Sequence, residues 1–414
     1  MPRTPVPTPL FDEVDTLKTR QPAAYLTATQ NKDLLQADQF LLCYQNNKAT
    51  FTAYRREVER LLQWCFLKEN KTLKQLKRDD IDSYIKFCMK PLKSWIGVKK
   101  VARFKLQSGA RRANPDWRPF VASLSKAEVS QGKTPNSDDY SLSQKSLQDI
   151  FTVTSSFFNF LIQEDYVGVN PVQKVRQKNK YFQKYQTKKV VRKLSELQWG
   201  YVIETAYMMA NEDSKYERTL FIMNILYSLY LRISELVASE RWTPTMGGFA
   251  RDPDGLWWFT TVGKGNKERQ IAVSPSMMKA LKRWRKHLGL PMTPTIGEAI
   301  PLIPKHLGDG PITSDRPIRK LVQECFDNTV ERLIKDGLPD EAEPLKQATV
   351  HWLRHTGISD DVKIRPREHV RDDAGHSSSN ITDKYIDVEL RDRYNTAKKK
   401  QIIPESFEEE MEGL

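Results

Sequence analysis

The side chains best suited to chemistry lie in the second half of the chain. They are two arginines, a lysine, two histidines and a tyrosine: Arg232, Lys264, His351, Arg354, His376 and Tyr385. Arginine stays protonated and can bind phosphate oxygens through two parallel hydrogen bonds. The free pKa of tyrosine is about 10, so its hydroxyl becomes a nucleophile only beside positive charge and a proton acceptor. Together, these residue types suit attack on a phosphodiester, whose developing negative charge needs such donors.

Each of these residues also has a purely structural explanation. Arg232, within Tyr-Leu-Arg-Ile-Ser-Glu-Leu, can be an ordinary helix-surface arginine, and Lys264 can be a solvated turn residue. His351 and Arg354 are three residues apart, which places both on one side of a helix, but such pairs are usually structural. Most tyrosines are packing residues, so Tyr385 taken alone is best explained in that way. Only the order and spacing of the whole set favour chemistry.

The elements that must position this set are mostly helices. Apolar spacing predicts helices over 216–237, 275–287 and 318–335. Two strands, 256–263 and 268–273, are expected to form a hairpin, because Gly265-Asn266 between them supplies the positive φ of a tight turn. Between Arg354 and His376, one proline and several aspartates predict a broken or reshaped helix: Asp360, Asp361, Pro366, Asp372 and Asp373.

The first half of the chain also shows helical periodicity. Three amphipathic helices are expected, over 50–65, 78–89 and 143–164. Residues 1–34 are rich in proline and polar residues, which predicts a flexible extension or a loosely docked arm. The expected domain order is this extension, a helical domain over 35–170, a basic linker over 171–194, a second domain over 195–400 and a tail over 401–414.

The charge of the chain favours a polyanionic partner. It has 66 Lys+Arg against 52 Asp+Glu, a formal charge of +14. Two stretches concentrate the excess, an insertion at about 90–140 and the linker. Phosphate binding is favoured for both, and a solvated loop and a merely flexible linker are the alternatives. The DNA-backbone candidates in these stretches are Lys99, Lys100, Arg103, Lys178, Lys180, Lys184, Lys188 and Lys189.

Several classes of protein are disfavoured by what the sequence lacks. The four cysteines are far apart, with no CxxC or Cys/His cluster, so neither a disulfide framework nor a zinc site is indicated. No apolar run approaches the ~20 residues of a membrane span, and the first residues lack a signal-peptide core. We therefore expect a protein of a reducing, cytosolic compartment, neither secreted nor membrane-spanning.

The ordered motifs resemble those of the tyrosine recombinase (phage integrase) family. The matching pieces are Leu-Arg232-Ile-Ser-Glu-Leu, Gly-Lys264-Gly-Asn-Lys-Glu-Arg, His351-Trp-Leu-Arg354-His-Thr and Gly-His376-Ser-Ser followed by Tyr385. The clear match covers about 216–390. The resemblance implies a mainly α fold with a small β-sheet (α+β), in which a helical SAM-like core-binding domain and a catalytic domain form a C-shaped DNA clamp.

The resemblance also implies a role for each residue. Arg232 and Arg354 would bind the non-bridging phosphate oxygens, and His376 would donate a further hydrogen bond. Tyr385 would attack to form a 3′-phosphotyrosyl bond, with His351 accepting its proton.

Lys264 would protonate the leaving 5′ oxygen. Lys267 competes for that role, while Glu235 and His355 are expected to support or pack rather than react. The bond energy stays in the phosphotyrosine link, so no cofactor or metal is implied.

The implied function is site-specific recombination for a mobile element, in the bacterial cytoplasm or nucleoid. The implied assembly is a homotetramer on two double-stranded DNA sites, with accessory DNA-binding proteins or sister recombinases as possible partners. A catalytically impaired DNA-binding accessory subunit and a type IB topoisomerase-like enzyme stay open as alternatives. A departure from the family pattern is Tyr230, where a glycine is usual.

Overall fold

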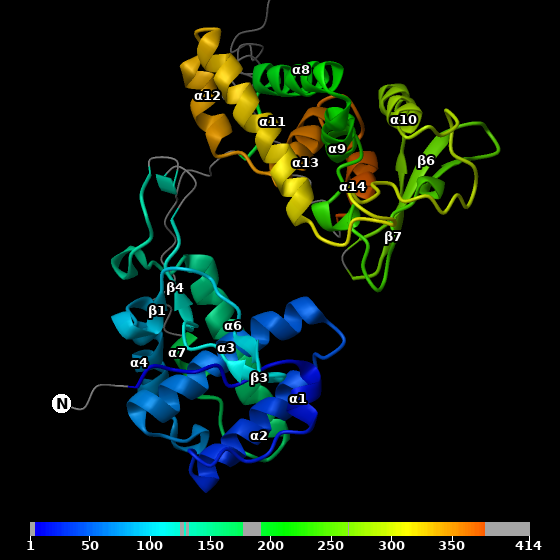
Figure 1. Cartoon of the computed structure of the whole chain (residues 1–414). Coiled ribbons are helices and arrows are strands. Elements are labelled where there is room, and N and C mark those ends of the chain that lie inside the picture. Colours follow the sequence, from blue (N-terminus) through cyan, green and yellow to red (C-terminus); the bar gives the residue numbers. More distant parts are fainter. Residues whose placement is uncertain (1–4, 125–127, 130–131, 177–191, 264, 377–414) are drawn as a thin grey trace, which may run out of the picture. The chain divides into compact units, whose positions relative to one another are not determined.

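The computed structural model divides the chain into two compact units, Met1–Lys188 and Lys189–Leu414 (Figure 1). It describes residues 5–124, 128–129, 132–176, 192–263 and 265–376. Both units are mainly helical with small sheets, as the sequence predicts.

The first unit is a bundle of helices around an aromatic core. Trp64 and Tyr84 lie 5.3 Å apart between ring centroids, and Phe40 and Phe157 lie 5.0 Å apart. The helices are α1 (Val14–Lys18), α2 (Ala28–Leu42), α3 (Lys48–Trp64), α4 (Arg78–Met89), α6 (Gln144–Gln163) and α7 (Pro171–Arg176). α3, α4 and α6 confirm the three amphipathic helices expected from apolar spacing, with α4 matching at both ends.

Of the two alternatives for residues 1–34, a flexible extension is wrong for residues 5–34, and a docked arm fits them. Residues 5–34 pack onto the bundle: Phe11 and Leu34 are buried, and α2 begins at Ala28. The backbone N–H of Leu10 donates to the Glu59 carboxylate at 2.6 Å. Prolines discourage regular structure but not docking, so an irregular segment can still insert a buried aromatic ring.

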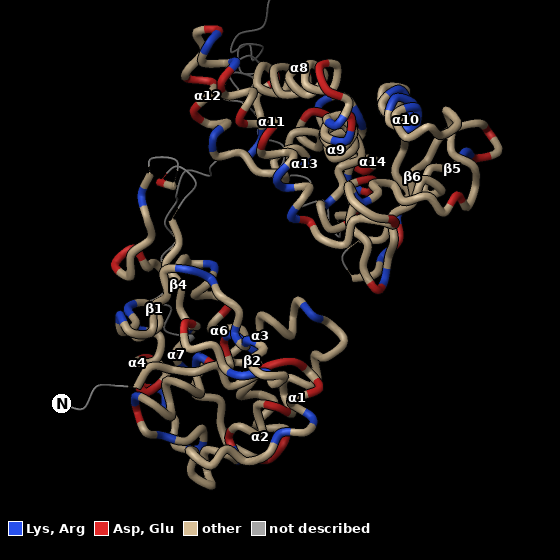
Figure 2. Tube along the Cα trace, in the orientation of Figure 1, with Lys and Arg blue, Asp and Glu red and all other residues tan. Residues whose placement is uncertain are grey.

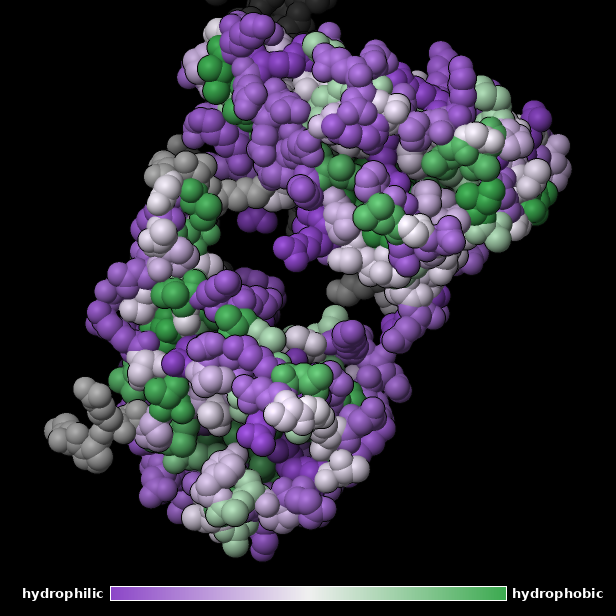
Figure 3. All heavy atoms as spheres, in the orientation of Figure 1, coloured by the Kyte–Doolittle hydropathy of each residue, from purple (hydrophilic) through white to green (hydrophobic). Residues whose placement is uncertain are grey.

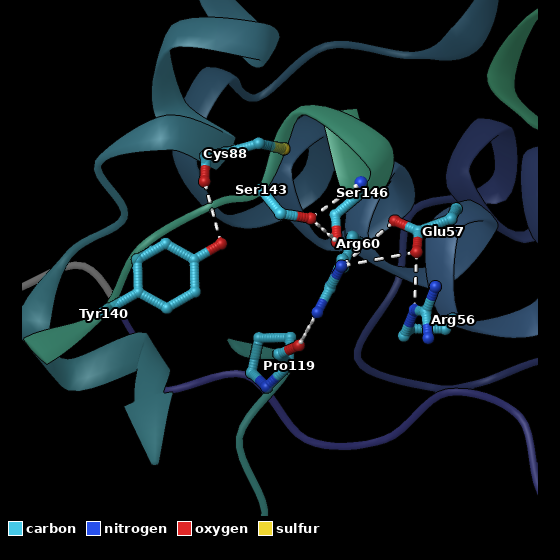
Figure 4. Close-up of polar contacts among 8 residues, drawn as sticks. All are labelled: Arg56, Glu57, Arg60, Cys88, Pro119, Tyr140, Ser143 and Ser146. Carbon is cyan, nitrogen blue, oxygen red and sulfur yellow. Dashed lines mark hydrogen bonds and ion pairs between the residues drawn. The ribbon is translucent and has the colours of Figure 1, made fainter. Parts of the chain in front are cut away.

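The basic insertion is anchored to the bundle rather than freely solvated. Its strands are β1 (Ile96–Gly97), parallel to β4 (Phe120–Val121), and β2 (Phe104–Gln107), antiparallel to β3 (Ala110–Ala113). Arg60 on α3 donates from Nη2 to the Pro119 carbonyl at 2.7 Å and lies over the Phe120 ring. The Tyr140 hydroxyl donates to the Cys88 carbonyl at 3.0 Å (Figure 4). The insertion therefore starts and ends on fixed points of the bundle.

The second unit consists of a helical core and a three-stranded antiparallel sheet at one side of it (Figure 1). The sheet order is β5-β6-β7, with β5 at Phe249–Arg251, β6 at Trp257–Val262 and β7 at Glu268–Ala272. The helices are α8 (Glu196–Glu212), α9 (Glu217–Ser228), α10 (Pro275–His287), α11 (Arg316–Lys335), α12 (Pro339–Lys346), α13 (Val350–Asp361) and α14 (Arg367–Ala374). α13 packs against α9, and α14 packs against β7.

The predicted helix over 216–237 is too long. α9 ends at Ser228, and Tyr230 adopts a left-handed conformation with φ 49°, so the helical hydrogen-bond pattern stops before Arg232. The hairpin of β6 and β7 is confirmed. The third strand of the sheet, β5, which pairs with β6, was not predicted. The break between Arg354 and His376 is also confirmed, because α13 ends at Asp361 and α14 begins at Arg367.

No helix of the described residues is long and apolar enough to cross a bilayer. On the visible face in Figure 3, hydrophilic residues predominate and the hydrophobic ones form small separate patches. Charged residues of both signs are spread along both units (Figure 2).

Candidate active site

Arg232 is held at the start of a short turn by a buried carboxylate. It precedes the 3-10 turn Ile233–Glu235, and its Nη1 donates to Glu235 Oε1 at 3.0 Å. Its backbone N–H donates to the other oxygen of the same carboxylate at 2.9 Å. The Arg232 side chain is 30% exposed and Glu235 is 3% exposed, so the guanidinium reaches the surface from a buried anchor. A phosphate can therefore approach this arginine from solvent.

Arg354 lies on α13 and is almost fully buried, with 1% of the residue exposed. Its guanidinium donates to two main-chain carbonyls, those of Tyr230 and of Ala374, the latter at 2.6 Å. Its Nη2 is also 3.2 Å from His376 Nε2. Arg354 thus ties the segment before Arg232 to the segment before His376.

Both candidate histidines lie within the field of the two arginines. Burial lowers the pKa of His376 to about 4, and the charges of Arg354 and then Arg232 add to the effect. Burial, followed by the same two charges, lowers the pKa of His351 as well. His351 also meets His355 edge-to-face, with ring centroids 4.3 Å apart. At neutral pH both imidazoles are uncharged, so His351 can accept a proton and His376 can donate a hydrogen bond.

The end of the β6–β7 hairpin lies beside Arg232. A Cβ placed on Gly263 would come within 2.8 Å of Arg269 Nη1 and 3.6 Å of Arg232 Nη1, so a side chain there would displace the Arg269 guanidinium. Lys264, the next residue, lies outside the described residues, and so does Tyr385. The structure therefore brings together Arg232, His351, Arg354 and His376, while the positions of the other two stay predictions.

Arg269 is a site residue that the sequence interpretation missed. Its guanidinium binds both oxygens of Glu235, at 3.0 and 2.8 Å, and its Nε donates to the Asp373 carbonyl at 2.9 Å. It stands at the end of Gly-Lys-Gly-Asn-Lys-Glu-Arg, so its place in that motif was the available signal. Glu235 was expected to support rather than react, and its contacts agree with that role.

Among the proposed DNA-backbone residues, Arg103 needs correction. It is paired with the buried Glu59 carboxylate and lies 4.8 Å from the Trp117 ring centroid, so it holds the insertion in place. Lys99 and Lys100 are exposed, as a phosphate contact requires. The linker candidates fall outside the described residues: Lys178, Lys180, Lys184, Lys188 and Lys189.

A metal centre finds no support in the described part of the chain. No group of three His, Cys, Asp or Glu side chains lies close enough there to hold a metal ion. The positive side chains of the site suit an anionic substrate instead.

Two curated proteins match part of the sequence. Tyrosine recombinase XerC of Pediococcus pentosaceus is 27% identical over 150 residues, which make up 36% of this chain and 44% of that protein. Tyrosine recombinase XerD of Rickettsia bellii is 26% identical over 177 residues, 41% of this chain and 54% of that protein. The chain thus spans about half the length of the curated relatives it matches. No protein-family model matches the chain.

Solved structures resemble the chain over most of its length. The XerH site-specific recombinase bound to a difH substrate aligns with a TM-score of 0.55 at 13% identity, over 93% of both chains. The Tn1549 transposon integrase in complex with a circular intermediate DNA aligns with a TM-score of 0.52 at 16% identity, over 88% of this chain and 98% of the integrase. At such identities these likenesses show the fold.

The structural similarity and the partial sequence similarity indicate the same class of protein, namely proteins with the fold of site-specific DNA recombinases. The chain has this fold, and part of its sequence is similar to that of tyrosine recombinases.

Proposed function

We propose that this protein cleaves and rejoins DNA strands through a covalent bond between Tyr385 and a 3′ phosphate, as a site-specific recombinase of a mobile element. The observation that carries the proposal is the convergence of two arginines and two uncharged histidines in one unit. The DNA-bound state of the similar XerH and Tn1549 structures supports double-stranded DNA as the substrate.

In the proposed reaction, Arg232 and Arg354 bind the non-bridging oxygens of the scissile phosphate. His376 donates a further hydrogen bond, and losing one donor of this kind costs about 10²–10³ in rate. His351 takes the proton of the attacking Tyr385 hydroxyl. The oxygen of the tyrosine bonds to phosphorus while the bond from phosphorus to the 5′ oxygen breaks.

Lys264 is proposed to give its proton to the departing 5′ oxygen. The support is indirect: its neighbour Gly263 lies against Arg269 and near Arg232, so the hairpin brings this part of the chain to the phosphate-binding arginines. Rejoining reverses the step, when a 5′ hydroxyl attacks the phosphotyrosine. A homotetramer on two DNA sites is part of the proposal, since strand exchange needs two cleaved duplexes.

A covalent trapping experiment tests the function. Duplexes that bind the protein are selected from a randomised pool and rebuilt with a nick beside the cleavage position, so that the released fragment diffuses away. We expect a protein–DNA adduct that survives denaturing gels, with none for Tyr385→Phe. Selected DNA bound tightly without any adduct would refute the proposal in favour of a binding-only accessory role. Relaxation of supercoiled plasmid of any sequence would instead favour a topoisomerase.

DNA contact by the insertion is a separate part of the proposal. Lys99 and Lys100 are exposed, and Arg112 is exposed on β3. Replacing all three by alanine should lower the slope of log K against log salt by about 2.7, at roughly 0.9 per phosphate contact. Lys346→Ala is the control, since Lys346 is ion-paired with Glu343 at 2.6 Å. An unchanged slope in the triple variant would exclude the insertion from the DNA interface.

A further inference from the structure

The connection between α13 and α14 carries an arginine that points back into the unit. Arg365 donates from Nη1 to the Tyr230 hydroxyl at 3.0 Å and to Asp361 Oδ2 at 3.1 Å. Its other terminal nitrogen, Nη2, donates to Asp373 Oδ2 at 2.6 Å. The Arg365 side chain is 29% exposed and that of Asp373 is 8% exposed. One guanidinium therefore joins the end of α13, the end of α14 and the segment that follows α9.

Tyr230 is the least expected member of this cluster. It is 1% exposed and its ring packs in a small apolar cluster with Ile358, Val370 and Ala374. Its hydroxyl donates to the Asp361 carboxylate, and burial followed by the charge of Asp361 raises the pKa of the phenol, which therefore stays protonated. Its φ of 49° is a left-handed conformation that bulky residues rarely adopt. The hydroxyl contacts hold the ring where the backbone alone would resist it.

The same two segments support Arg354. One of its terminal nitrogens donates to the Tyr230 carbonyl and the other to the Ala374 carbonyl. Arg365 donates hydrogen bonds to the Tyr230 hydroxyl and to the carboxylate of Asp373, the residue before Ala374. Both acceptors of the buried arginine are thus fixed by a single second arginine.

We propose that Arg365 is a positioning residue for Arg354, setting the distance between the Tyr230 and Ala374 carbonyls that aim its guanidinium. This inference rests on the proposed function, in which Arg354 binds the scissile phosphate. A guanidinium aimed by rigid acceptors needs no reorganisation when the phosphate gains charge. Without Arg365, Asp361 and Asp373 lose their shared cation, and the distance between the two segments is held by fewer contacts.

The first test measures cleavage of the trapped substrate in a single turnover with saturating DNA. The Arg365→Gln variant should cleave the DNA roughly 10- to 100-fold more slowly than the wild type, which is the scale of an approximately 1 Å misplacement. Its affinity for DNA should stay within about twofold of the wild-type value. Arg365→Lys should recover only part of the rate, because one ammonium cannot fork to both carboxylates. Arg367→Gln, an exposed arginine at the start of α14, is the charge-matched control and should keep the wild-type rate.

A mutant cycle separates positioning from general stability. In an Arg354→Lys background the effect of Arg365→Gln should shrink to about twofold, since the group it positions has been removed. An equal fold-loss in both backgrounds would overturn the proposal. If Arg365→Gln does not fold, Tyr230→Phe replaces it in the cycle, because it removes only the hydroxyl and keeps the buried ring.

A spectroscopic readout keeps this inference apart from the proposed function. The guanidinium N–H signal of Arg354 in the full chain without DNA is identified by its loss in Arg354→Lys. We expect it to be sharp in the wild type and in Arg367→Gln, and broadened in Arg365→Gln and Tyr230→Phe. An unchanged sharp signal in the last two variants would refute positioning. If the wild type forms no adduct with DNA, the proposed function fails, and the signal alone still decides the role of Arg365.

Discussion

Glu235→Gln tests the buried carboxylate on which both Arg232 and Arg269 depend. The carboxylate accepts four hydrogen bonds, two from Arg269 at 3.0 and 2.8 Å and two from Arg232 at 3.0 and 2.9 Å. Glutamine keeps the shape but turns an NH₂ group toward a guanidinium and removes the charge. Breaking a buried ion pair in this way costs about 3–5 kcal/mol. For a domain of this size, that is a fall in melting temperature of about 6–20 °C.

The assay is calorimetry of the full chain at neutral pH, with Glu204→Gln as the matched control. Glu204 pairs with Arg332 at 2.8 Å, but its side chain is 63% exposed, so its loss should cost less than about 1 kcal/mol. The reasoning is refuted if the two variants melt within about 2 °C of each other.

The pH dependence of the stability difference between the wild type and Glu235→Gln gives a second check. Burial acts to raise the pKa of the Glu235 carboxyl, but Arg269 and then Arg232 outweigh it and hold that pKa below its usual 4.5. A depressed carboxyl pKa stabilises the fold above the unfolded-state pKa and loses this contribution as the pH falls through the folded-state pKa. The gap between wild type and Glu235→Gln should therefore be constant from pH 7 to about 5.5 and should narrow below 4.5. A gap that widens in acid would contradict the assignment.

Three further predictions follow from burial and close approach. The rate of DNA cleavage by the wild type should be constant above pH 6.5 and should fall in acid, because His351 has a lowered pKa and must be neutral to accept a proton. In single-turnover assays, His351→Ala should cleave about 10²-fold more slowly and should lose this pH dependence. Gly357→Ala should lower the melting temperature strongly, since its Cβ would lie 2.1 Å from the Tyr227 carbonyl oxygen, whereas Gly200→Ala on the open face of α8 should raise stability by up to about 1 kcal/mol. A thiol reagent on the native protein should modify Cys43 alone, as mass spectrometry would show, because the other three cysteines are buried and burial raises their pKa values.

Local patterns predicted the helices well where a cap and an apolar face coincide. α10 matches its expected range at both ends, because Ser274 accepts from the Met277 N–H and Pro275 occupies the first turn. The end of α9 was not predictable in the same way. Tyr230 takes a left-handed conformation through contacts with residues more than 120 positions away, and helical periodicity contains no information about such contacts.

The candidate site shows the same division. The motifs placed Arg232, His351, Arg354 and His376 in one site, because each motif carries its own reactive residue. The supporting contacts of Arg269 and Arg365 join segments that lie 104 and 135 residues apart in sequence, and no spacing rule connects them. Lys264 and Tyr385 rest on their motifs alone.

The tyrosine at position 230 has a consequence for the evolution and engineering of this chain. In the family pattern that the chain resembles, a glycine usually stands here and needs no side-chain support. A tyrosine in the same backbone conformation depends on Asp361 and Arg365, so the three residues are expected to show epistasis: each substitution alone is harmful, and a combined replacement is tolerated better than the sum of the single losses. A chimaera that takes the segment before Arg232 from one relative and the α13–α14 connection from another should therefore fail, even when every catalytic residue is present.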